Sequence, residues 1–121
     1  MAFEVSLQTV SVPASADLST KQFLFGTINA SGQVAVVGAG LASDGVIALG
    51  PSAQARPCAL ASFPGQLARV MAGASFANGA LLEADANGKA ITQSSGKILA
   101  KALAAAGAAG DIVPVLLILQ R

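Results

Sequence analysis

The sequence has no histidine, tryptophan or tyrosine and only one cysteine, Cys58. Without histidine, a Cys-His nucleophile pair cannot form. A single cysteine closes no internal disulfide, which fits synthesis in a reducing cytoplasm. Because Cys58 is followed by the apolar residues Ala59 and Leu60, we expect it to be a small buried side chain.

Charged residues are scarce. They make up 11% of the chain, with a net charge of +1, against about 25% in an ordinary soluble domain. Nucleic-acid binding calls for clustered basic residues and stacking aromatics. The basic residues here are dispersed and the only aromatics are five Phe, so we expect no nucleic-acid partner. So little charge indicates a surface that partners cover in an assembly, with a small alanine-rich monomer as the alternative.

Long hydrophobic runs are also missing, although 54% of the residues are hydrophobic and the mean hydropathy is +0.67. A helix that spans a bilayer needs about 20 apolar residues. The strongest apolar run, residues 112–119, is interrupted by Pro114. The alanine-rich stretch 98–109 contains Lys101 and Gly107. The sequence therefore predicts no membrane partner.

Glycine-containing turn signals separate short apolar runs along the whole chain, which predicts an all-β barrel or sandwich. The expected strands span residues 3–12, 22–28, 33–37, 45–49, 55–62, 67–71, 80–84, 90–93, 97–103 and 112–119. Residues 97–106 also favour a helix through their alanine, leucine and lysine content. We therefore expect either an all-β fold or a mostly β fold with one short helix. Pro57 and Pro114 lack a donor N–H and indicate edge positions or bulges.

A weak internal repeat relates the two halves. Phe23-Leu24-Phe25 leads into Asn29-Ala30-Ser31-Gly32, and Ala80-Leu81-Leu82 leads into Asp85-Ala86-Asn87-Gly88, 56 residues later. Each half continues with a strand, a glycine turn and an apolar strand. A duplicated β-unit that closes into one barrel would explain this order. Chance similarity in a chain rich in alanine and glycine is the alternative.

The few acidic residues lie mostly in or beside turn signals. Asp44, Asp85 and Asp111 are expected to set turn geometry through hydrogen bonds from backbone N–H groups. Glu83 and Asp85 would share one face of a strand, but no other sequence feature indicates a pocket beside them. The run that begins at Asp85 lacks the further oxygen ligands of a calcium loop. We expect no catalytic residue, no metal and no cofactor, and we predict that the protein is not an enzyme.

The N-terminal residues 1–16 are expected to form an extended arm or the first strand, ahead of a single β-rich domain in residues 17–121. Glu4 takes the place of a basic n-region, so no signal peptide is expected. An arm with apolar side chains can add as a strand to the sheet edge of another protein. The candidate partner-binding residues are Phe3, Val5, Leu7, Val10 and Val12. These apolar residues stand at odd positions before Gln8 and at even positions after it. The change indicates a bulge or contact with two surfaces.

The order of these features resembles the small decoration, or cement, proteins of tailed-phage capsids. The residues that carry the resemblance lie between about residues 18 and 119: Lys21–Phe25, Ala42–Gly50, Ala55–Leu60, Ala68–Ala74, Phe76–Leu82, Asp85–Ala90, Ile98–Leu103, Ala105–Gly107 and the final apolar strand. The resemblance implies a β-barrel-like body and a homotrimer on the outer capsid surface of the virion, made in the host cytoplasm. It also implies that the protein stabilises the shell by bridging subunits of the major capsid protein.

Two other functions remain open from the sequence. One is a different self-assembling shell or surface-layer subunit. The other is a small non-catalytic β-barrel that acts as a binding or carrier module, for which Lys89 lies near a hairpin tip but lacks the expected flanking residues.

Overall fold

The computed structural model describes residues 9–50 and 53–121, and within them the chain is all β with no helix. The strands are β1 (Thr9–Pro13), β2 (Phe25–Ile28), β3 (Val34–Val36), β4 (Gly45–Leu49), β5 (Pro57–Ala61), β6 (Leu67–Met71), β7 (Leu81–Ala84), β8 (Ala90–Thr92), β9 (Ala100–Ala102) and β10 (Ile112–Leu117). Each overlaps one strand expected from the sequence, so the all-β prediction is confirmed. In the ambiguous stretch 97–106, the structure contains the strand β9 rather than a helix.

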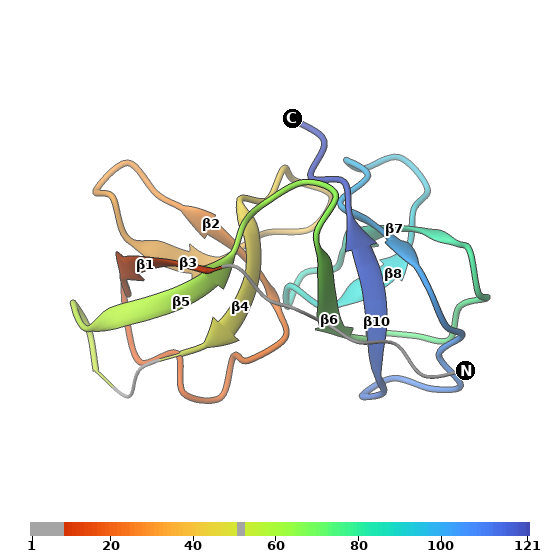
Figure 1. Ribbon diagram of the computed structural model, residues 1–121, viewed down its shortest axis with the longest axis horizontal. Helices are drawn as coiled ribbons and strands as arrows, with labels where there is room; N and C mark the ends of the chain where they lie inside the picture. The colour runs from red at the N-terminus through yellow and green to blue at the C-terminus, as the bar shows by residue number, and fades with distance from the viewer. Residues whose placement is uncertain (1–8, 51–52) are drawn as a thin grey trace.

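The strands form two five-stranded antiparallel sheets that lie side by side as two lobes (Figure 1). Sheet A, in the first lobe, has the order β1-β5-β4-β2-β3, and sheet B, in the second lobe, has the order β6-β10-β9-β7-β8. The order is the same in both, with each strand of sheet B five places later in the chain. The repeat seen in the sequence is therefore a repeat of topology. Its two copies form two open sheets and do not close into one barrel.

The turns show that the repeat extends to single residues. Asn29 Oδ1 accepts hydrogen bonds from the N–H groups of Ser31 and Gln33. In the second lobe, the Oδ1 of Asp85 accepts from Asn87 and Lys89 in the same way. The fourth residue of each turn is a glycine with positive φ, 74° at Gly32 and 77° at Gly88. This conformation favours glycine. We call residues 29–33 the Asn29 turn and residues 85–89 the Asp85 turn.

The two lobes divide the apolar core unequally. One cluster belongs to the first lobe alone and contains Val34, Ile47, Cys58 and Leu60. The larger cluster fills the second lobe and also takes in Phe25, Val37, Val46 and Ala61 of the first lobe. Because side chains alternate along a strand, Ile47 points to one cluster and Val46 to the other. Sheet A is thus buried on two sides and joins the lobes.

Edge strands were one of the two placements expected for the two prolines, and neither proline lies in one. Pro57 is the first residue of β5, and Pro114 lies inside β10, which is a central strand between β6 and β9. Pro114 is opposite Arg69 of β6, but pairing with β9 begins only at Val115. Pro114 therefore lies just beyond the paired part of β9, where its O accepts the hydrogen bond of Leu103 N–H at 3.0 Å and its missing N–H leaves no reciprocal bond.

The segment 1–16 contains the strand β1, which pairs antiparallel with β5 at the edge of sheet A. Ala14 continues the chain beside Val34 through a parallel bridge, and Ala72 makes the corresponding bridge to Ala90 in the second lobe. Residues 1–8 lie outside the described residues. The division at residue 16 into an arm and a domain stays a prediction.

Candidate interaction surface

The predicted partner-binding residues fall into two groups. Val10 and Val12 lie in β1, where they are half-buried and pack against the cluster of the first lobe. Phe3, Val5 and Leu7 lie outside the described residues. The structure thus gives the two described valines a packing role within their own sheet, and partner binding by the five residues stays a prediction.

The acidic residues expected in turns are held by hydrogen bonds. Asp85 caps its own turn, and Asp111 Oδ2 accepts from the N–H groups of Gly107 and Ala108. Asp44 differs from the expectation, because its Oδ2 accepts from Ile28 N–H at 2.7 Å, 16 residues earlier. It also pairs with Arg121. Asp44 therefore joins two segments rather than shaping its own turn.

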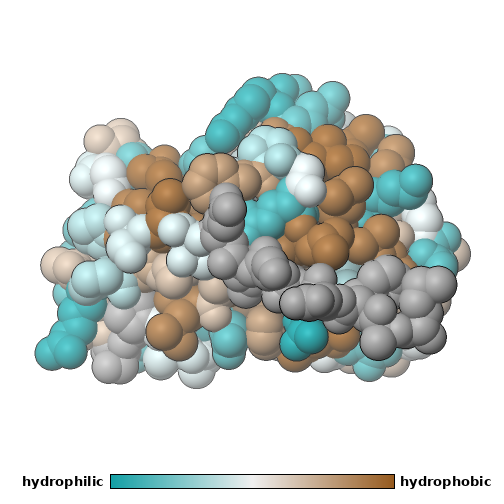
Figure 2. Space-filling view, in the orientation of Figure 1, coloured by the Kyte–Doolittle hydropathy of each residue, from teal (hydrophilic) through white to brown (hydrophobic). Residues whose placement is uncertain are grey.

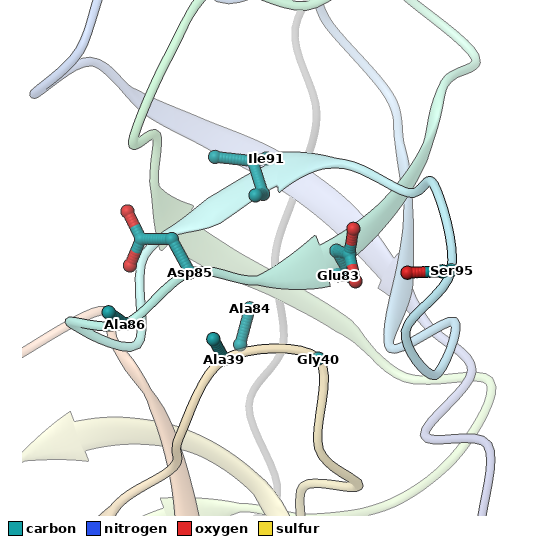
Figure 3. Close-up of a pocket in the computed structure, with 8 residues that line it drawn as sticks. All are labelled: Ala39, Gly40, Glu83, Ala84, Asp85, Ala86, Ile91 and Ser95. Carbon is teal, nitrogen blue, oxygen red and sulfur yellow. The ribbon is translucent and has the colours of Figure 1, made fainter.

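A pocket of about 340 Å³ lies beside Glu83 and Asp85, where the sequence had indicated none (Figure 3). The two carboxylates lie at its opposite ends, with Ala84 between them. Glu83 is buried, and its Oε1 accepts hydrogen bonds from the N–H and hydroxyl of Ser94, both at 3.0 Å. The two carboxylates thus accept hydrogen bonds from different segments of the chain.

Cys58 is fully buried, as expected, and burial raises the pKa of its thiol. Within residues 9–50 and 53–121, no three His, Cys, Asp or Glu side chains lie close enough to hold a metal ion. The same residues contain no helix long and apolar enough to cross a membrane.

The contact between the lobes covers a row of three side chains on sheet A. Phe25 of β2 is opposite Val46 of β4, and Val46 is opposite Ala61 of β5. These three residues, the first row, are 0%, 2% and 1% exposed. Two parts of the second lobe lie against them: the N-terminal half of β6 and the Asp85 turn. Gly88 O accepts the hydrogen bond of Phe25 N–H at 2.8 Å.

β6 completes this contact from the other side of the row. Its residues Ala68 and Arg69 line a small hollow together with Phe23, Val46 and Ala61. The N–H of Met71 donates to Phe23 O at 2.9 Å. The joint between the lobes therefore combines apolar packing with backbone hydrogen bonds, as a continuous core does.

Among the described residues, no strand or turn lies over the corresponding row of sheet B in the way that β6 and the Asp85 turn lie over the first row. Leu81 of β7 is opposite Lys101 of β9, and Lys101 is opposite Leu116 of β10. In this second row Leu81 is 41% exposed and Lys101 is exposed, whereas Leu116 is half-buried. The surrounding side chains on the same face are also mostly apolar. The open face of sheet B consists of Leu67, Arg69, Met71, Leu81, Lys101, Ile112, Pro114, Leu116 and Ile118.

Figure 2 shows hydrophobic side chains gathered over the lobe that carries β6 and β10. Along β10, Ile112 is 47% exposed, and Ile118 just beyond it is 37% exposed. Arg69 and Lys101 are the charged members of the open face and both are cationic. Exposed apolar faces often take part in binding macromolecules, and this face is the candidate interaction surface.

No family model and no curated protein sequence matches this chain. A solved structure does match, the N base of the head fiber gp8.5 of bacteriophage phi29, with a TM-score of 0.72 and 16% sequence identity. The match covers 94% of this chain and 98% of the other. This chain has the fold of a phage head fiber base. The resemblance to phage capsid proteins drawn from the sequence is thereby confirmed at the level of the fold.

Sequence reasoning did not identify the open face, although a signal for it was present. Residues 112–119 are apolar at every position, without the polar alternation of a strand that has one face in water. Such a run is typical of a strand buried on both faces. In β10, the odd-numbered residues Val113, Val115 and Leu117 are buried, so their side chains point into the core. The even-numbered residues of β10 lie on the open face.

Proposed function

We propose that the protein is a structural component of a tailed-phage virion. In this role it binds the outer surface of the capsid and stabilises the shell by bridging subunits of the major capsid protein. The observation that carries the proposal is the fold shared with a phage head fiber base along nearly the whole of both chains. The sequence resemblance to decoration proteins supports it independently, because it rests on the order of turns and strands rather than on their arrangement in space.

The role requires contact surfaces and no reactive groups. The acidic side chains described above are held in hydrogen bonds. We include in the proposal that the protein is not an enzyme and that it acts as a homotrimer. Several copies that bind adjacent subunits add their modest contacts through effective concentration.

The test is co-sedimentation of the purified protein with capsids that lack their decoration, followed by thermal disruption of the shell with and without the protein. We expect saturable binding and a higher disruption temperature. Absence of binding to expanded capsids would contradict the proposal. A regular assembly of the protein alone, with no affinity for capsids, would instead support the surface-layer alternative.

The predicted N-terminal contact enters the same assay through a deletion of residues 1–8, which leaves β1 in place. If these residues anchor the protein, the shortened chain keeps a cooperative thermal transition and binds capsids more weakly. Unchanged affinity of the folded deletion would remove Phe3, Val5 and Leu7 from the contact.

A further inference from the structure

The internal repeat shows what kind of surface covers a row such as the open one. Within the chain, the first row of sheet A is covered by β6 and the Asp85 turn of the second lobe. The counterparts of these covering elements in the first lobe are β1 and the Asn29 turn. Among the described residues, each chain therefore has a first row that is covered by β6 and the Asp85 turn. It also has a second row that is open, and a matching pair of elements, β1 and the Asn29 turn, that cover no such row.

The two turns confirm that one cover is used and the other is free. Gly88 of the Asp85 turn is buried, and a Cβ added to it would lie 2.5 Å from the Val36 side chain and 3.1 Å from Phe25 O. Gly32 of the Asn29 turn is exposed, and an added Cβ would meet nothing within 4 Å. The φ angle is nearly the same at both glycines, so the two positions differ in what each turn contacts.

We propose that the open face of sheet B binds the first lobe of a second copy of this chain, in a head-to-tail contact that repeats the joint between the lobes. The Asn29 turn of one copy then lies against Leu81 of the next, as the Asp85 turn lies against Phe25. Contacts between two different surfaces of identical chains close into a ring or continue as a filament, depending on the rotation between copies.

This contact is weaker than the joint inside the chain for two reasons. Lys101 stands in the second row where the first row has Val46. In addition, Pro13 is the counterpart of Met71, and proline has no N–H to repeat the hydrogen bond that Met71 donates to Phe23 O. Association is therefore reversible and depends on concentration. It does not depend on capsid binding, so this contact and capsid binding can each fail while the other stands.

The first experiment measures the mass of the full chain by sedimentation velocity over a wide concentration range. We expect oligomers above the 11.8 kDa chain. Leu81→Glu should weaken association at least about tenfold, as for an apolar anchor at the centre of an interface. Leu49→Glu is the matched control, because Leu49 is 66% exposed at the end of β4 and belongs neither to the open face nor to β1 or the Asn29 turn. Ile112→Glu provides a second variant should Leu81→Glu fail to fold.

The second experiment tests the head-to-tail geometry with cysteines at Ser31 and Leu81 and a short bismaleimide. The buried Cys58 does not react in the folded chain. We expect cross-linked dimers when the Ser31→Cys and Leu81→Cys variants are mixed, and none with either alone. Cross-linking of Leu81→Cys with itself would overturn the proposal in favour of a symmetric contact.

Four further results would overturn it, and the last two would also identify another occupant of the open face. A monomer at every concentration, or association unchanged by both glutamate variants, excludes a second copy on this face. If Leu81→Glu leaves association intact but abolishes capsid binding, the capsid is the occupant. If the chain associates only after residues 1–8 are deleted, those residues cover the face within one chain.

Discussion

The two lobes share one plan of strands and turns and differ in what covers them. In sheet A the first row of side chains is buried beneath the second lobe, whereas the matching row of sheet B contains an exposed leucine and an exposed lysine. Topology depends on turns and strand pairing, which both halves retain. Burial depends on a few side chains and on neighbours, which they do not share. A duplicated unit can thus keep its fold while one copy becomes an internal joint and the other an outer surface.

The two lobes differ in available space at Gly45 of β4. A Cβ at this position would lie 2.2 Å from Ala61 O, and its φ of 152° is one that other residues rarely adopt. We expect Gly45→Ala to lower the free energy of unfolding by about 3 kcal/mol or more, because the clashing atoms belong to the backbone. Urea unfolding followed by circular dichroism measures the change.

The control lies at the same place in the second lobe. Gly45 pairs with Gly26, and its counterpart Ala100 pairs with Leu82. Ala100 is fully buried and already has a Cβ. Ala100→Gly should cost only about 1 kcal/mol, the usual loss on placing glycine in a strand. Equal losses at the two positions would mean that the lobes do not differ in this packing.

The second comparison separates backbone strain from packing. Gly88→Ala adds a methyl group against Val36 and Phe25 O at the joint, whereas Gly32→Ala adds the same group in open space at nearly the same φ. We expect a loss of about 1 kcal/mol from the left-handed conformation alone at Gly32, and of about 2–3 kcal/mol at Gly88, where overpacking is added. Unfolding is measured in dilute solution, where copies do not associate. Losses of similar size would show that the Asp85 turn does not pack tightly on the first lobe.

The sequence predicted the strands well because their signals are local. Turn residues such as Asn29 and Asp85 bracket each apolar run, and the ten expected ranges each overlap a strand. The separation into two sheets could not be predicted in this way. It depends on which strands pair, such as β1 with β5 and β6 with β10, and these strands are far apart in the chain. The open face was missed for the same reason, because Leu81 and Phe25 occupy matching places and only their distant neighbours differ.

The smallest expected effect concerns Asp44, whose place in the second lobe is taken by Leu99. The N–H of Asp44 donates to Gly26 O, and that of Leu99 donates to Leu82 O. Leu99 is buried in the larger cluster, whereas the Asp44 carboxylate accepts from Ile28 N–H. One lobe thus uses an apolar side chain where the other uses a charge, and only the first lobe should respond to acid here.

Partial burial acts to raise the pKa of Asp44, but hydrogen bonds from Ile28 N–H, Arg121 and the Thr27 hydroxyl outweigh it, and the net pKa is lowered. The carboxylate therefore stabilises the folded chain fully above the unfolded pKa of about 3.9, and this contribution is lost as pH falls through the lower folded value. We expect Asp44→Asn to cost about 1 kcal/mol at pH 7 and less at pH 2. The free energy of unfolding of both proteins, measured by urea between pH 7 and pH 2, checks this. Arg121→Gln removes the exposed ion pair with Asp44 and keeps the Asp44 charge. We expect this ion pair to contribute less than about 1 kcal/mol to the free energy of unfolding and to be screened by salt. A difference between wild type and Asp44→Asn that stays constant across this pH range would show that the charge of Asp44 does not stabilise the fold.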